Sequence, residues 1–280
     1  MTSWRKRRRP SSKKSRRGPA SRTPAAEPRC VFAACWRRCA IRPGKRVVVL
    51  VDEYDKPILD AMKTPETAEA NRDDLRGLYA TIKDADAYVR FAFLTGVSLF
   101  SDLNNLTDLT LDRRYANICG YTDADLDTVF APELTGLDRE EIRRWYNGYN
   151  WRGDENVYNP FDVLLLFSKP EFGPYWFETG TPTFLIETLL RRQVDIPSLD
   201  GLRSDDALLS RFDVRDMEPK ALLFQTGYLT IRGEERAFDG TPLYRLGYPN
   251  HEVRRSLSAS LLAVRFAGDV FLFEFKVVEQ

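Results

Sequence analysis

The stretch from Val47 to Val51 is an unbroken run of aliphatic, mostly β-branched side chains, and it ends abruptly in the acids Asp52 and Glu53. A run this short and apolar on both faces is typical of a buried central strand in a parallel sheet. In open α/β sheets, ligands bind beyond the carboxyl ends of such strands. The pattern therefore predicts an α/β fold in which these two carboxylates face a ligand-binding cleft.

In P-loop NTPases, a buried strand that ends in two acids is the Walker B element. Asp52 would then hold the water shell of a Mg²⁺ ion that bridges the nucleotide phosphates. Glu53 would polarise the attacking water as a general base. On this pattern alone, a plain polar turn from Asp52 to Asp55 is the alternative interpretation.

The segment after this strand predicts a second parallel strand. Residues 65–85 have apolar side chains at three- and four-residue spacing, which predicts a helix, and residues 88–94 read as a strand. Thr95 follows that strand, in the place of the sensor residue of AAA-type ATPases, where it would bind the γ-phosphate or the attacking water. Alternatively, Thr95 simply ends the strand before Gly96.

The sequence contains no Gly-x4-Gly-Lys-Ser/Thr loop, which P-loop enzymes use to cradle phosphates. Gly44 and Lys45 are followed by Arg46 and Val47, so this dipeptide reads as a turn into the strand. Backbone N–H groups and a lysine at the phosphates supply nucleotide affinity and transition-state stabilisation. We therefore expect ATP binding and hydrolysis to be weak or absent.

The charge is strongly divided along the chain. Residues 1–46 hold 16 Lys/Arg and one acid, whereas the whole chain carries a net charge of +1. The head therefore carries +15 and residues 47–280 carry −14. Like-charge blocks separated by Pro and Ser predict an unfolded head. It could bind nucleic acid through phosphates or act as a nuclear-localisation signal; the third interpretation is coding sequence read from a wrong frame or start.

The remaining composition excludes several classes of protein. No apolar run approaches the roughly 20 residues of a membrane helix, so we expect a cytoplasmic protein without membrane contact. The four cysteines have no zinc-site spacing, and His251, the single histidine, excludes His-rich metal sites and a Ser-His-acid triad. Residues 121–256 predict a helix-rich second region with a small β-hairpin formed by residues 228–231 and 243–246.

Many short motifs resemble, in the right order, the AAA-ATPase-like family of bacterial proteins over about residues 46–256. They are Val-Leu-Val-Asp-Glu-Tyr-Asp55, Phe-Leu-Thr-Gly-Val97, Leu-Asn-Asn-Leu-Thr-Asp-Leu-Thr110, Trp-Tyr-Asn-Gly-Tyr149, Tyr-Asn-Pro160, Tyr-Trp-Phe-Glu-Thr-Gly-Thr-Pro182, Gly-Tyr-Leu-Thr230 and Tyr-Pro-Asn-His-Glu-Val-Arg254. The family fuses a P-loop ATPase module to a C-terminal PD-(D/E)xK nuclease-like domain. The resemblance implies ATP and Mg²⁺ as ligands, with Asp52 at the magnesium and Glu53 and Thr95 as catalytic residues.

The nuclease part that the resemblance implies is represented near the end of the chain. Glu274 and Lys276 alternate along a predicted strand and share one face, so they could share a Mg²⁺ site. Asp269 lies closer to Glu274 than the family's acid would, and it receives no role. The alternative is an edge strand with a surface ion pair between Glu274 and Lys276.

The predicted fold class is α/β: a partial P-loop NTPase-type parallel sheet, then a helix-rich lid or winged-helix-like region, then a remnant nuclease strand. The predicted parts are residues 1–45, 46–135, 136–256 and 257–280. The predicted function is a degenerate or truncated AAA-ATPase-like protein. The alternatives are the remnant of a Mg²⁺-dependent nuclease fusion and a non-enzymatic protein that binds nucleic acid through its basic head.

Overall fold

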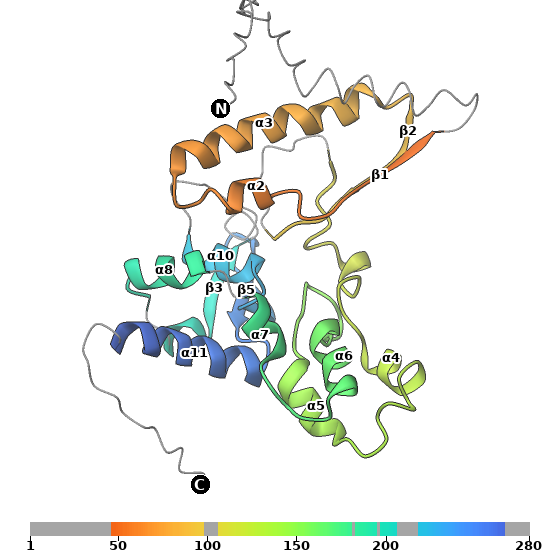
Figure 1. Ribbon diagram of the computed structural model, residues 1–280, viewed down its shortest axis with the longest axis vertical. Helices are drawn as coiled ribbons and strands as arrows, with labels where there is room; N and C mark the ends of the chain where they lie inside the picture. The colour runs from red at the N-terminus through yellow and green to blue at the C-terminus, as the bar shows by residue number, and fades with distance from the viewer. Residues whose placement is uncertain (1–45, 98–105, 181–182, 195–196, 206–217, 267–280) are drawn as a thin grey trace, which may run out of the picture.

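The computed structural model describes residues 46–97, 106–180, 183–194, 197–205 and 218–266. They form a mixed α/β protein with a small parallel sheet, an antiparallel sheet and surrounding helices (Figure 1). The α/β prediction is confirmed at this level. The basic head and the segment with Asp269, Glu274 and Lys276 lie outside the described residues.

The first sheet is the parallel pair β1 (Val47–Val51) and β2 (Val89–Leu94). The chain passes between them through helices α2 (Lys56–Leu59) and α3 (Pro65–Asp84). The register places Val48 beside Phe91, Leu50 beside Phe93 and Val51 beside Leu94. The predicted order of strand, helix and parallel strand is confirmed.

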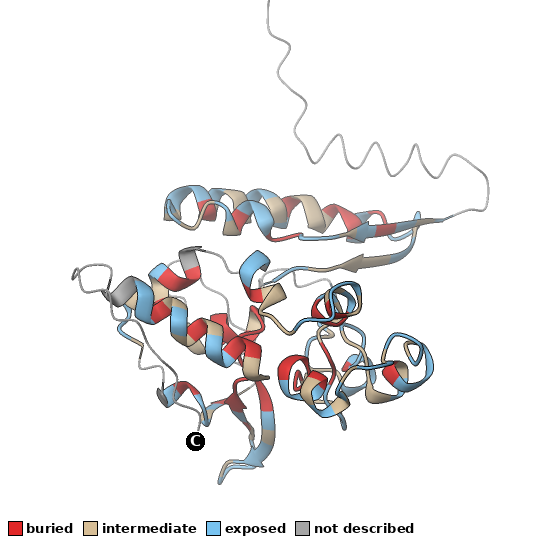
Figure 2. Ribbon diagram, turned by 60° about the horizontal axis from the view of Figure 1, so that its bottom comes forward, coloured by how far each residue is buried: buried red, intermediate tan, exposed pale blue. Residues whose placement is uncertain are grey.

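The prediction that β1 is a central strand buried on both faces is wrong for the described residues. Among these, β1 pairs with β2 alone, and Val48 and Leu50 are 54% and 70% exposed. The physical reason is that a helix, α3, lies on only one side of the strand pair (Figures 1 and 2). Val49, which points to the opposite face from Val48 and Leu50, is buried.

The middle region is a small helical unit with α4 (Asp123–Thr128), α5 (Arg139–Tyr146) and α6 (Pro160–Ser168). Each helix begins at a side-chain cap: Thr122 forms a capping box with Asp125, Asp138 accepts from the first turn of α5, and Asn159 accepts from Phe161 N before α6. Its core contains the buried side chains Leu126, Ile142, Trp145, Tyr146, Tyr158, Val163 and Leu166.

The last region combines helices with an antiparallel sheet. The helices are α7 (Tyr175–Gly180), α8 (Thr183–Arg191), α10 (Pro219–Gln225) and α11 (His251–Phe266), and the strands are β3 (Leu202–Asp205), β4 (Thr230–Arg236) and β5 (Pro242–Gly247). The strand order is β3-β5-β4. The predicted hairpin between residues 228–231 and 243–246 is confirmed as β4 and β5, whereas the sequence analysis missed β3.

A large core joins this last region to the loop after β1. It includes Tyr54 and Ile58 near α2, Phe177 on α7, Phe224 on α10 and Leu257 on α11. In Figure 2, α11 shows buried and exposed stripes, as expected for a helix that packs one face onto a core. None of the described helices combines the length and the apolar character that crossing a membrane would need.

Candidate functional site

The carboxyl ends of β1 and β2 lie at the same edge of the parallel pair, and they bring Asp52 and Thr95 together. Thr95 Oγ1 donates a 2.5 Å hydrogen bond to Asp52 Oδ1. The ladder continues just beyond the strands, because Thr95 N donates to Val51 O and Tyr54 N donates to Thr95 O, at 2.8 and 2.9 Å. The backbone therefore fixes the relative position of these two side chains.

Glu53 adopts a backbone conformation that is unusual for its residue type. Its φ angle is +49°, in the left-handed region that favours glycine. Its backbone N–H donates to Asp52 Oδ1 at 3.0 Å, so one carboxylate oxygen of Asp52 accepts two hydrogen bonds. Strained backbone of this kind is concentrated at functional sites, where the surrounding structure holds it.

Asp55, which follows β1 in the same turn as Asp52 and Glu53, is the buried acid of this edge. It is 1% exposed, whereas Asp52 and Glu53 are exposed. A Cβ atom on Gly96 would come within 2.6 Å of Asp55 Oδ1 and of the Tyr54 ring. Gly96 is therefore required for the close approach of the two strand ends, a role that the pattern Thr-Gly after a strand only hints at.

The donor set at this edge suits one part of a magnesium nucleotide. Mg²⁺ keeps most of its waters and is usually held by one or two carboxylates together with substrate phosphates, which Asp52 and Glu53 could provide. The described residues contain no group of three or more His, Cys, Asp or Glu able to hold a metal by themselves. The given sequence contains no phosphate-cradling Gly-Lys-Ser/Thr loop, so we derive no hydrolytic step from these residues.

A second, buried polar cluster joins Asp162 to residues of several quoted motifs, namely Tyr149, Trp176, Phe177 and Glu252. Asp162 on α6 and Glu252 on α11 are both 0% exposed. Asp162 Oδ1 accepts from Trp176 N at 2.8 Å, and Glu252 Oε1 accepts from Phe177 N at 3.0 Å. The two carboxyls therefore bind the free N–H groups in the first turn of α7.

Asp162 and Glu252 lie in the same buried site, and Asp162 Oδ2 and Glu252 Oε2 have no hydrogen-bond partner among the described residues. Burial, and after it the nearby Asp162, raise the pKa of Glu252 to about 9. Burial likewise raises the pKa of Asp162, to about 6. The buried Tyr149 hydroxyl faces the same cluster, and its pKa is raised well above the ordinary value by burial, then by Glu252 and Asp162. The raised pKa of Glu252 favours its protonated form at neutral pH.

Several residues of the quoted motifs surround this cluster as core or turn residues. Tyr146 and Phe177 are buried core residues. Asn147 ends α5, is itself buried, and precedes Gly148, whose φ is +116°. His251 begins α11 after Asn250, whose Oδ1 accepts from Val253 N at 3.1 Å, and the partly buried His251 ring lies 4.7 Å from the Trp145 ring, edge to face.

Comparison with known proteins bears on the first of these two sites. Residues 3–105 match the model of the AAA-ATPase-like family, described as "Predicted AAA-ATPase", and this range includes Asp52, Glu53 and Thr95. An "Uncharacterized protein in vnfD 5'region" of Azotobacter chroococcum mcd 1 is 58% identical over 242 residues, which cover 84% of this chain and 46% of that protein. The chain thus spans about half the length of this relative. No solved structure matches it.

Proposed function

We propose that this chain carries the magnesium-facing half of an ATPase module, because residues 3–105 match the model of the AAA-ATPase-like family. In an intact ATPase site, Asp52 would hold Mg²⁺ through water, Glu53 would be the general base and Thr95 would occupy the sensor position. The observation that carries this proposal is the 2.5 Å hydrogen bond from Thr95 Oγ1 to Asp52 Oδ1 across the ends of two parallel strands. It makes the two side chains neighbours although 43 residues separate them.

The proposal includes weak or absent ATP binding and hydrolysis by this chain alone. The sequence offers no backbone cradle or lysine for the phosphates, and in P-loop enzymes these groups supply most of the nucleotide affinity. In addition, Asp52 and Glu53 are exposed at the end of a strand that has one described neighbour. In this arrangement water screens both carboxylates and lowers their effect on a bound phosphate.

The division of the chain is part of the proposal. Residues 46–135 form the partial ATPase-like core, and residues 136–256 form its helix-rich C-terminal part. Residues 1–45 are a basic segment that binds nucleic acid. We propose residues 257–280 as a remnant of a nuclease-like domain, which the alternation of Glu274 and Lys276 supports, although residues 257–266 complete α11 and Leu257 packs in the main core.

Two measurements on the purified chain test the proposal. With Mg²⁺ and ATP, we expect phosphate release to be equal for the wild type and Glu53→Gln; robust hydrolysis that Glu53→Gln abolishes would overturn the claim of lost activity. With Mn²⁺ as a paramagnetic substitute for Mg²⁺, we expect Asp52→Asn to weaken binding and Asp60→Asn to leave it unchanged. Asp60 is a matched control because it is exposed and pairs only locally with Lys56. Equal Mn²⁺ binding by both variants would contradict the proposed metal-binding role of Asp52.

A further inference from the structure

Two adjoining clefts lie on the side of the molecule where α5 ends, α11 begins and β4 passes. The first has a volume of about 550 Å³ and the second about 300 Å³. Asn156 and Arg232 line both clefts, so these two residues form the boundary between them. Asp52 and Thr95 line neither cleft, which makes this region separate from the proposed ATPase edge.

The lining of the clefts has the opposite charge to the rest of the folded chain. Residues 47–280 carry a net charge of −14, yet arginines outnumber acids along both clefts. The lining acids are Asp123, Glu155 and Glu234. The lining arginines are Arg113, Arg143, Arg144, Arg152, Arg232 and Arg254. Such a concentration of one sign of charge in a cleft attracts a ligand of the opposite sign.

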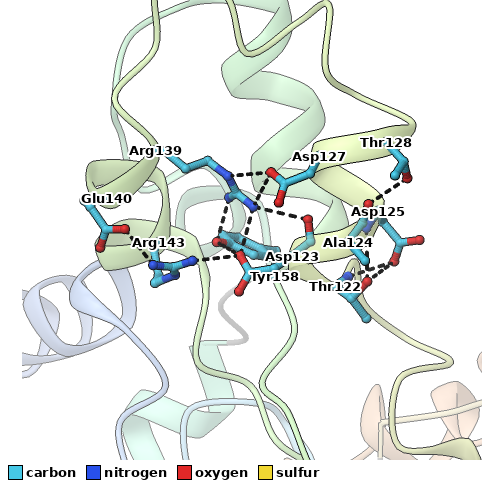
Figure 3. A network of polar contacts seen from close by, with 10 residues as sticks. All are labelled: Thr122, Asp123, Ala124, Asp125, Asp127, Thr128, Arg139, Glu140, Arg143 and Tyr158. Carbon is cyan, nitrogen blue, oxygen red and sulfur yellow. Dashed lines mark hydrogen bonds and ion pairs between the residues drawn. The ribbon is translucent and has the colours of Figure 1, made fainter.

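Most of these guanidinium groups are held in place by the protein. In Figure 3, Arg143 lies against Asp123, 3.1 Å away, and Asp123 also accepts from Tyr158 and Arg139. Arg152 lies over the Tyr244 ring at 5.6 Å, and Arg254 lies over the Tyr248 ring at 5.5 Å. A guanidinium carries five N–H donors, so a group fixed by one or two contacts retains donors for a ligand. Fixing the side chain beforehand lowers the entropy lost on binding.

Arg232 differs from the other lining arginines. Its side chain forms no ion pair or hydrogen bond with another residue in the part of the chain that the structure describes, and it is exposed. It sits in the bulge of β4, where the pairing with β5 shifts between Ile231 and Gly233. β-Bulges redirect side chains away from the regular alternation of a strand. Here the bulge coincides with an arginine at the boundary of both clefts.

We propose that the two clefts form one binding site for a phosphodiester strand, that is, for nucleic acid, and that Arg232 contacts a phosphate at its centre. Arginines spaced along adjoining clefts match the repeated charges of a nucleic acid backbone better than a single phosphate group. Arginine also forms bidentate hydrogen bonds with phosphate oxygens. The proposal does not depend on Asp52, Glu53 or ATP.

The test compares two arginines of the same strand in the full-length chain. Arg232→Ala removes the proposed contact, whereas Arg236→Ala removes the same charge from β4 outside both clefts. Both variants keep the basic head, so its contribution to binding cancels in the comparison. Binding of a fluorescein-labelled single-stranded oligonucleotide is measured by anisotropy at several salt concentrations, with thermal unfolding to confirm that both variants are folded.

We expect Arg232→Ala to bind about threefold to tenfold more weakly, with a salt dependence of log K that is shallower by about 0.7, as the loss of one phosphate contact predicts. Arg236→Ala should bind like the wild type. An unlabelled duplex, inorganic phosphate and polyglutamate serve as competitors, and we expect nucleic acid to displace the probe far better than the last two. Equal affinity and salt dependence of the two variants, or displacement by polyglutamate as effective as by oligonucleotide, would overturn the proposal.

Discussion

Thr95 donates its hydroxyl to Asp52 at 2.5 Å, and this bond joins the ends of β1 and β2. Because both residues follow their strands directly, the contact depends on the parallel register that places Val51 beside Leu94. This hydrogen bond lies at the edge of the sheet where the proposed ATPase residues are. A substitution can remove the bond without changing the size of the side chain.

Thr95→Val tests the strength of this link. Valine has the shape of threonine but no hydroxyl, so Asp52 Oδ1 loses one of its two donors. We expect the free energy of unfolding to fall by about 1 kcal/mol, the usual contribution of one hydrogen bond. Urea unfolding measures it. Thr135→Val is the control, since Thr135 is exposed and its hydroxyl has no partner among the described residues. Equal losses in the two variants would show that the Thr95 bond contributes nothing.

The left-handed backbone of Glu53 predicts that its glycine variant is more stable than its alanine variant, which reverses the usual order of stability. For most residues alanine is more stable than glycine, but at a φ of +49° the Cβ atom costs about 1–2 kcal/mol. We therefore expect Glu53→Gly to be more stable than Glu53→Ala by about 1 kcal/mol. At Asp74, in the middle of α3, the order should be the normal one, with alanine more stable by about 1 kcal/mol. Chemical denaturation of the four variants decides the question.

The buried carboxyl pair predicts that stability falls with rising pH. Glu252 has a raised pKa, about 9 in the folded chain against an ordinary 4.5, so the folded state holds a proton that the unfolded state releases. The free energy of unfolding should therefore decrease between about pH 4.5 and 9, by a few kcal/mol in order of magnitude. Glu252→Gln should remove this decrease, because an amide does not titrate over this range.

Thermal unfolding across that pH range provides the measurement for the Glu252 prediction. Glu133→Gln is the matched control, since Glu133 is exposed and should leave the pH dependence unchanged. A slope that persists in Glu252→Gln would place the proton elsewhere. A wild-type chain whose stability rises over the same range would contradict the sign of the prediction.

Gly148 and Gly240 both have a positive φ, but only Gly148 is in close contact with another segment. Alanine variants at the two positions therefore distinguish the cost of a steric clash from the cost of the backbone conformation. A Cβ atom on Gly148 would lie 1.9 Å from Pro249 O, whereas one on Gly240 would meet nothing within 4 Å. Gly240→Ala should lower the free energy of unfolding by about 1–2 kcal/mol, because alanine disfavours the left-handed backbone conformation. Gly148→Ala should cost at least 2 kcal/mol more, because the start of α11 must move away from α5. Similar losses in both variants would show that this junction can relax freely.

Local signals in the sequence were sufficient for most of the elements. Caps such as Thr122, Asp138 and Asn159, the Asn-Gly stop after α5, and the apolar runs of β1 and β2 predict their elements because neighbouring residues decide them. The exposure of Val48 and Leu50 could not be predicted in this way. Burial depends on which other segments cover a strand, and a run of apolar residues does not contain that information.

Because local patterns do not show which distant segments meet, the sequence predicts the contact of Asp52 with Thr95 but not that of Asp162 and Glu252 with α7. The pairing of Asp52 with Thr95 follows from one parallel crossover, so the sequence pattern already places them together. The pairing of Asp162 with Glu252 joins residues 90 positions apart through three helices. No local spacing connects them; only the shared first turn of α7 brings them into contact.

The open face of the strand pair determines how firmly Asp52 is held. Val48, Leu50 and Phe91 are each more than half exposed, and an isolated strand pair is marginal in water. Little burial therefore opposes a transient separation of β1 from β2. Amide protons of β1 should exchange with solvent well before those of α5 and α6, whose side chains fill a closed core. Each such opening would release Asp52 from Thr95 while the rest of the chain stays folded.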